Sequence, residues 1–189
     1  MATLPHFREQ AVFLRQASGS TQIEITLLKV LKVFKRFDIP HYVCGGFAVQ
    51  EHGYPRFTVD VDIIVPDVAF AREELSINGF RPNGGSSRTL TDCETEVEVE
   101  LLPGGSKVDS GPLTLPMPAK ISSTPLFLTL EELISSKLST YMGRGVQGLQ
   151  DFADVGKLIE SNELARDFEV ESGVQDLYRQ LRDELHAGT

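Results

Sequence analysis

The chain has 189 residues, a formal net charge of −9 and 41% hydrophobic residues, a size that suits one globular domain or two small lobes. This composition excludes disordered and collagen-like chains, and the net charge argues against a protein that binds DNA or RNA mainly by neutralising phosphates. No segment approaches the roughly 20 apolar residues of a membrane helix, and the N-terminus lacks a secretory pattern. We therefore expect a cytoplasmic protein with no membrane partner.

The first part of the chain predicts a mixed α/β unit. Apolar residues at three- and four-residue steps indicate helices, runs of β-formers indicate strands, and a Gly-, Ser- and Pro-rich stretch indicates a loop. In chain order we expect a helix at 21–38, a strand at 41–44, a helix at 47–52, a strand at 57–65, a helix at 68–77, a loop at 81–92 and a strand at 95–102. In the last strand, Glu96, Glu98 and Glu100 share one face.

The second part of the chain predicts helices. Thr129 and Glu132 form a capping-box pattern that begins a helix reaching about residue 141, and further helices follow at 147–160 and 174–185. We expect residues 1–120 to form the α/β core and residues 121–189 to form a helical lobe, packed on the core as effectively one compact unit.

Two aspartates in a β-rich run are the first candidate for chemistry. Asp60 and Asp62 would project from one face of a strand, while Val59, Val61 and Ile63 would point into the core. Two adjacent like charges repel each other unless a cation lies between them, and Mg²⁺ prefers carboxylate oxygens and substrate phosphates. A third carboxylate on a neighbouring strand would allow two metals about 3.5–4 Å apart, which align an attacking oxygen with a leaving pyrophosphate.

A glycine pair precedes these aspartates. Gly45 and Gly46 lie between a strand and a short helix, where unhindered backbone N–H groups suit a triphosphate. The pair is followed at short range by Arg56 and Thr58, then by the two aspartates and later by the acidic strand. This order is considerably more specific than the glycine pair alone.

The order of these motifs resembles the polymerase-beta-type nucleotidyltransferase superfamily, in the branch that holds AbiE-type and minimal nucleotidyltransferases, over roughly residues 23–160. The resemblance implies an α/β (α+β) fold in which a twisted mixed sheet with flanking helices precedes a small helical lobe. It also implies an enzyme dependent on Mg²⁺, or on Mn²⁺. Such an enzyme binds a nucleoside triphosphate (NTP) such as ATP and transfers the nucleoside monophosphate (NMP) to a hydroxyl of a small molecule, a tRNA or a protein.

The resemblance also implies roles for single residues. Asp60, Asp62 and Glu100 would be the catalytic and metal-binding carboxylates, with Glu98 as the alternative third acid on the same face. The nucleotide-binding residues would be Gly45, Gly46, Arg56, Thr58 and Lys137. Arg56 and Thr58 could instead only brace the turn and strand, and Lys137 could be an ordinary solvated lysine. Asp154 could orient Lys137 or Arg144.

Some residues depart from the family pattern. Phe47 follows the glycine pair where a serine hydroxyl is common, and Gln150 replaces a lysine before Asp151. A second hypothesis is therefore a catalytically reduced protein of this fold, acting as a nucleotide-binding or toxin–antitoxin partner. A third is an α/β interaction domain in which the aspartates form a solvated strand face. Because the C-terminal part is acidic, we expect nucleic acid only as an acceptor end.

Overall fold

The computed structural model describes residues 20–107, 110–122 and 124–187 of the chain. Its elements are α2 (Ser20–Arg36), β1 (Tyr42–Val43), α3 (Gly45–Glu51), β2 (Asp60–Val65), α4 (Val68–Ile77), β3 (Phe80–Pro82), β4 (Thr89–Asp92), β5 (Glu98–Pro103), α5 (Leu130–Arg144), the 3-10 helix η1 (Gly145–Gly148), α6 (Leu149–Ser161) and α7 (Gln175–Ala187). Among these helices, none is long and apolar enough to cross a membrane.

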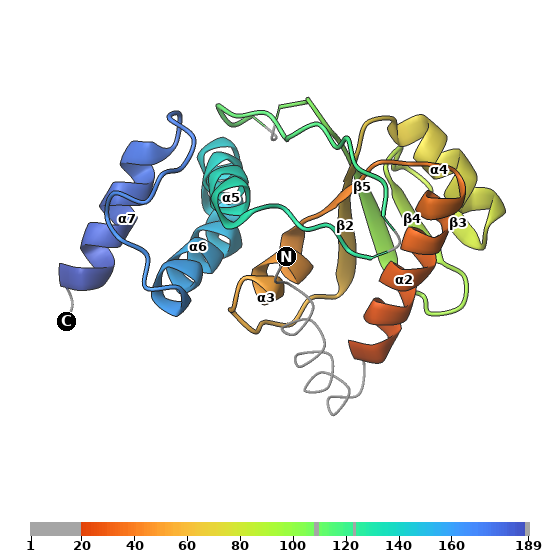
Figure 1. Cartoon of the computed structure of the whole chain (residues 1–189), viewed down its shortest axis with the longest axis horizontal. Helices are drawn as coiled ribbons and strands as arrows, with labels where there is room; N and C mark the ends of the chain where they lie inside the picture. The colour runs from red at the N-terminus through yellow and green to blue at the C-terminus, as the bar shows by residue number, and fades with distance from the viewer. Residues whose placement is uncertain (1–19, 108–109, 123, 188–189) are drawn as a thin grey trace.

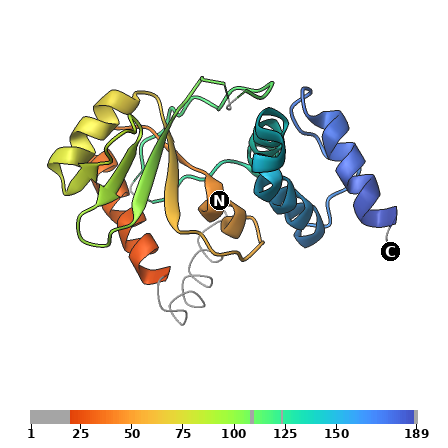
Figure 2. The same cartoon turned by 180° about the vertical axis from the view of Figure 1, so that it is seen from behind.

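The five strands form one mixed sheet in the order β1-β2-β5-β4-β3. The central strands β2 and β5 are parallel, and every other neighbouring pair is antiparallel. Helices α2 and α4 cover one face of the sheet, whereas α3 and the helical lobe of α5, α6 and α7 lie on the other side (Figures 1 and 2). The predicted α/β fold with a twisted mixed sheet and a C-terminal helical lobe is therefore confirmed.

Alternation along β2 divides the core between the two sides of the sheet. Val61, Ile63 and Val65 are fully buried in a cluster with residues of α2 and α4. Ile64 points the other way and packs in a second cluster with residues of α5, α6 and α7. Because side chains alternate along a strand, Asp62 shares the face of Ile64 and is turned toward the helical lobe.

The structure corrects three details of the predicted elements. The segment 81–92 is not a loop throughout, because β3 and β4 pair as a hairpin that buries Phe80 and Leu90. Val59 does not point into the core: it precedes β2 and is 79% exposed. Glu96 is not on the strand, since it lies in a turn with φ 60° and pairs with Arg81 at 2.7 Å.

The connection into the helical lobe runs along the edge of the sheet. Val43 of β1 forms a parallel bridge with Phe127, and its backbone N–H donates to the carbonyl of Leu126 at 2.7 Å. The capping box predicted for α5 is present, with Thr129 and Glu132 bonded to each other's backbone N–H. Residues after 121 thus pack directly on β1, and the division into units 1–120 and 121–189 stays a prediction.

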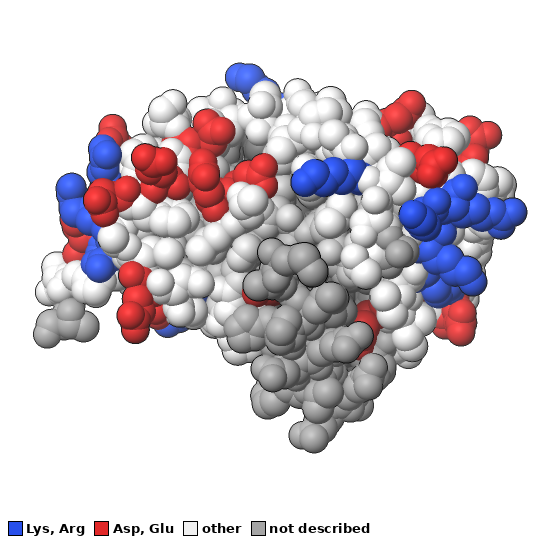
Figure 3. Space-filling view, viewed as in Figure 1, with Lys and Arg blue, Asp and Glu red and all other residues white. Residues whose placement is uncertain are grey.

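Charge is distributed unevenly over the face shown in Figure 3. Acidic side chains gather over the helical lobe, and a group of basic side chains lies over the side that carries α2 and α4. Basic side chains also line the outer edge of the lobe and acidic ones adjoin the basic group, so the two signs are unevenly distributed but not separated (Figure 3).

Candidate functional site

A cleft of about 170 Å³ lies between the sheet and α5. It brings together residues of β2, β5, α5 and α6, loops at the edge of the sheet, and Gly45. Gly45 and Gly46 begin α3, and we call these two residues the glycine turn. Its lining residues are Cys44, Gly45, Asp62, Arg88, Glu100, Leu102, Pro103, Lys107, Leu115, Leu133, Ser136, Lys137, Thr140, Arg144 and Asp151. Of the sequence-predicted site residues, Gly45, Asp62, Glu100 and Lys137 therefore meet at one place.

The register of the sheet places the acidic residues. Asp60 is the parallel partner of Glu98, and Asp62 is the parallel partner of Glu100. Glu100 is partly buried and lines the cleft, whereas Glu98 is exposed and accepts a hydrogen bond from the side chain of Asn83 at 2.7 Å. Of the two glutamates, only Glu100 therefore lines the cleft, and its role as the third acid stays a prediction.

Gly45 is held directly against Asp62. A Cβ atom added to Gly45 would overlap the carboxylate of Asp62 and would lie 2.7 Å from its Cγ. Gly45 also has φ 58°, a conformation that glycine adopts readily and other residues rarely adopt. Both the backbone and the neighbouring carboxylate therefore require glycine at this position.

Gly46 has a similar relationship to the segment before β2. An added Cβ would lie 2.5 Å from Cβ of Thr58 and 3.2 Å from a guanidinium nitrogen of Arg56. The hydroxyl of Thr58 donates to the carboxylate of Asp60 at 3.0 Å. Arg56 and Thr58 do not line the cleft; they lie against the glycine turn and the first residue of β2, where they are placed to brace both.

The carboxylate of Asp62 is in an unfavourable electrostatic environment. Burial, together with the negative charges of Asp60 and Glu100, raises the pKa of Asp62 to about 7, although Lys137 and Arg56 act in the opposite direction. Burial likewise raises the pKa of the neighbouring Cys44 thiol, with Asp62 adding to the shift. A cation bound beside Asp62 would relieve this repulsion.

The acids fit a hard divalent cation by their chemistry, because carboxylate oxygens are the donors that Mg²⁺ and Mn²⁺ prefer. Within the described residues, however, no group of three or more His, Cys, Asp and Glu side chains is arranged to enclose a metal ion. The side chains of Asp60, Asp62 and Glu100 share one sheet face, but Asp62 and Glu100 line the cleft whereas Asp60 does not.

A buried ionic network lies beside the cleft. Lys137 of α5 is only 5% exposed, and its ammonium group contacts the carboxylates of Asp151 and Asp154 of α6, each at 2.8 Å. Burial alone would lower the pKa of Lys137, but the two carboxylates raise it above its usual value. Lys137 is therefore not a solvated lysine, and the expected contact between Lys137 and Asp154 is present.

The network also joins the helical lobe to the core. Nε of Arg56 lies 3.4 Å from a carboxylate oxygen of Asp154, which is fully buried. Gln150 donates to the other oxygen of Asp154 at 2.9 Å. Asp154 thus connects the glycine turn, through Arg56, to the lysine that faces the cleft.

Several lining residues were not identified from the sequence. Arg88 lies in the segment expected to be a loop, Lys107 follows β5, and Ser136 and Thr140 flank Lys137 on the cleft side of α5. The spacing of Ser136 and Thr140 around Lys137 is a helical signal that could have identified the two hydroxyls. Nothing in the local pattern around Arg88 or Lys107 indicates that the fold brings them to the cleft.

No protein-family model matches the chain, and no curated protein matches it either. A solution structure of the antibiotic-resistance factor ANT(2'')-Ia is similar, with TM-score 0.50 and 13% sequence identity, covering 90% of this chain and 95% of that chain. A crystal structure of ANT(2'')-Ia in complex with adenylyl-2''-tobramycin has TM-score 0.47 and 14% identity, covering 87% of this chain and 98% of that chain. Neither structure bears on the AbiE-type branch, which stays a prediction. The first similarity shows that this chain has a nucleotidyltransferase fold.

Proposed function

We propose that the protein is a nucleotidyltransferase that moves an NMP from an NTP to an acceptor hydroxyl. The observation that carries the proposal is the pairing of Asp62 with Glu100 across two parallel strands, with Gly45 packed on Asp62 and the cleft above them. The glycine turn, whose N–H groups suit phosphates, therefore lies on one side of Asp62. Glu100, whose carboxylate suits an acceptor hydroxyl, lies on the other side. The shared fold supports the same conclusion.

In this proposal, Asp60 and Asp62 hold Mg²⁺ or Mn²⁺ together with Glu100. A divalent cation bound there neutralises charge on the phosphates and on the reacting oxygen. The backbone N–H groups of Gly45 and Gly46 receive the triphosphate. The ammonium group of Lys137 adds positive charge on the opposite wall of the cleft.

Glu100 accepts the proton of the acceptor hydroxyl. The acceptor oxygen then forms a bond to the α-phosphorus of the NTP, and the bond between that phosphorus and the pyrophosphate oxygen breaks. Lys137 keeps its charge throughout, because Asp151 and Asp154 hold its pKa above the usual value. Arg56 and Thr58 act indirectly in nucleotide binding, by fixing the glycine turn and Asp60. We place this reaction in the cytoplasm.

A second candidate function is nucleotide binding without transfer, in a toxin–antitoxin partner of the AbiE-type branch. The observation that favours it is the double ion pair of Lys137 with Asp151 and Asp154, which competes with phosphate for the ammonium group. Phe47 also supplies no hydroxyl next to the glycine pair.

Transfer of label from NTPs distinguishes the two functions. The wild-type protein is incubated with Mg²⁺, each of four α-labelled NTPs and three acceptor classes: hydroxylated small molecules including tobramycin, tRNA, and protein. We expect labelled acceptor with at least one class and none with Asp62→Ala. NTP binding without transfer to any acceptor would favour the second function, and labelling that persists in Asp62→Ala would contradict the assigned site.

A further inference from the structure

One end of the cleft is basic, and none of the sequence motifs accounts for it. Three segments of the fold contribute Arg88, Lys107 and Arg144, which all line the cleft and which we call the basic end. Arg88 immediately precedes β4, Lys107 follows β5, and Arg144 ends α5. From this placement we infer that the acceptor of the proposed transfer carries phosphate beside its reactive hydroxyl, an inference that rests on the proposed function.

The basic end lies beyond Glu100, away from the glycine turn. The carbonyl of Arg88 accepts a hydrogen bond from the backbone N–H of Leu101, one residue past Glu100 toward the carboxyl end of β5. Arg144 follows Lys137 by seven residues on α5, about 10 Å along the helix axis. Glu100 therefore separates the basic end from Gly45.

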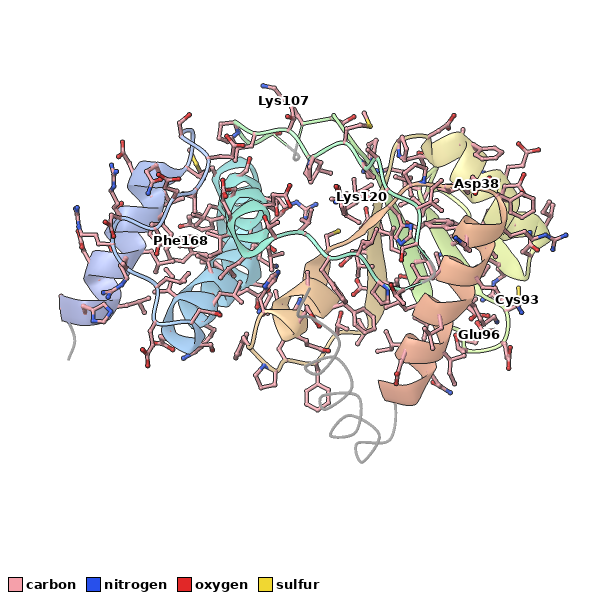
Figure 4. The ribbon with its side chains drawn as sticks, viewed as in Figure 1. Asp38, Cys93, Glu96, Lys107, Lys120 and Phe168 are labelled. Atoms are coloured by element: carbon pink, nitrogen blue, oxygen red, sulfur yellow. The ribbon has the colours of Figure 1, made fainter. Side chains whose placement is uncertain are left out.

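The loop that carries Lys107 reaches α5 near Arg144. A Cβ added to Gly143 would lie 2.7 Å from the backbone nitrogen of Gly111, and the N–H of Leu113 donates to the hydroxyl of Ser139 at 3.1 Å. Figure 4 shows the side chain of Lys107 extending outward from this loop. Lys107 thus contributes charge at the rim, where it attracts an anionic ligand as it approaches.

The charges of Arg88 and Lys107 are not balanced by the acids of the cleft. Asp151 is paired with Lys137, whereas Asp62 and Glu100 belong to the carboxylate pair assigned to the cation. Within the described part of the chain, neither Arg88 nor Lys107 forms an ion pair, and both are exposed. An arginine beside a groove is the residue type that best binds phosphate oxygens in two parallel hydrogen bonds.

The same charges disfavour a cationic acceptor. Amino sugars such as tobramycin are protonated at neutral pH, so their ammonium groups would meet Arg88, Lys107 and Arg144 at the position where the acceptor must lie. Like charges at a binding surface are a common basis for excluding a ligand. The basic end therefore favours a phosphorylated sugar, a nucleotide or the end of a nucleic acid over a polyamine.

A matched pair of ligands tests the acceptor class. Cytidine and cytidine 5′-monophosphate share the 2′- and 3′-hydroxyls of the ribose and differ at the 5′ position, where a hydroxyl is replaced by a phosphate. Binding of each is measured by ligand-observed NMR on the full chain, with Mg²⁺ and a saturating non-hydrolysable α,β-methylene NTP present to fill the nucleotide site. We expect the monophosphate to bind about tenfold more tightly than cytidine and tobramycin to bind more weakly than either.

Variants assign this preference to residues. Arg88→Gln and Arg144→Gln should each reduce the preference for the monophosphate about threefold, whereas Arg179→Gln, which removes an equal charge from α7, should leave it unchanged. A cytidine-terminated RNA oligonucleotide distinguishes the source of the phosphate: tighter binding than the monophosphate supports a nucleic-acid end, and equal binding supports a free phosphorylated molecule.

Three results would overturn the inference: equal binding of cytidine and its monophosphate, tighter binding of tobramycin, or no effect of Arg88→Gln. Binding of the NTP analogue with Mg²⁺ is recorded in the same samples. If the analogue binds while the phosphate preference is absent, only the acceptor assignment fails. If the analogue does not bind, the proposed function fails as well.

Discussion

The carboxylate of Asp62 fills the space that a side chain on Gly45 would need. A Cβ added to Gly45 would lie 2.7 Å from Cγ of Asp62, and the φ of 58° at Gly45 also disfavours any other residue. The glycine pair was expected to serve phosphates, but the structure gives Gly45 a second role. It lets Asp62 lie directly beside the turn expected to receive the triphosphate.

Replacing Gly45 by alanine should therefore displace Asp62 as well as strain the backbone. We expect Gly45→Ala to abolish NTP binding and to lower the free energy of unfolding by about 1–3 kcal/mol. The matched control is Gly53→Ala, because Gly53 also has positive φ (94°) but no described atom lies within 4 Å of an added Cβ. Urea unfolding and NTP titration of both variants provide the measurement. Unchanged NTP binding in Gly45→Ala would contradict the assigned geometry.

Glu100 and Glu98 offer a direct test of the third acid, because they lie on the same strand face two residues apart. Glu100→Gln should reduce transfer at least about 100-fold while NTP binding persists, since a glutamine cannot accept the acceptor proton. Glu98→Gln should leave transfer unchanged, because Glu98 is exposed and bonded to Asn83. Single-turnover rates of NMP transfer are measured for both variants. A larger loss of transfer rate in Glu98→Gln than in Glu100→Gln would make Glu98 the third acid instead.

Much of the fold could be predicted from local pattern, whereas the pairing of strands could not. The helix at 68–77 and the capping box of Thr129 depend on neighbouring residues and are both present. The register of Asp62 with Glu100 joins segments about 38 residues apart, and it is set by packing of Val61 and Val99 in the core. A slip of one residue would turn either acid to the opposite face.

The contrast between local patterns and long-range strand pairing also explains which site residues could be predicted from the sequence. Asp60, Asp62 and the glycine pair form a local motif, so the sequence indicated them. Arg88 reaches the cleft only because β3 and β4 form a hairpin at the edge of the sheet, and the Gly- and Ser-rich segment between them indicated a loop instead. Long-range pairing therefore decides which basic residues join the site.

Asp154 should be important for stability because it is fully buried between Arg56 and Lys137. Asp154→Ala leaves both cations in a less favourable environment and should lower the free energy of unfolding by about 3–5 kcal/mol. Glu160→Ala, which removes a half-exposed partner of Lys157 on the same helix, should change stability little. Urea denaturation measures the free energy of unfolding of both variants. Equal losses in Asp154→Ala and Glu160→Ala would show that the buried network does not stabilise the packing of the lobe on the core.

The raised pKa of Asp62 predicts a specific pH dependence without metal. Between about pH 4 and 7 the folded protein keeps a proton on Asp62 that the unfolded chain releases. The free energy of unfolding should therefore fall as the pH rises through this window, by at most about 4 kcal/mol from this group. The free energy of unfolding of wild type and of Asp62→Asn is measured in urea from pH 4 to 8. The difference between the two isolates the contribution of the Asp62 carboxyl. A difference that does not vary with pH would contradict the raised pKa.

The most direct test of the account is a calorimetric titration of an NTP with Mg²⁺ into the wild-type protein and into the double variant Asp60→Asn, Asp62→Asn. The double variant keeps the shape of both side chains but removes the charges assigned to the cation, and its circular dichroism spectrum is compared with that of the wild type to verify folding. We predict that the wild type binds the NTP in a Mg²⁺-dependent manner and that the double variant binds at least about 100-fold more weakly, a loss of about 2.7 kcal/mol. Equal binding by the two folded proteins would contradict the assignment of Asp60 and Asp62 as the centre of the site.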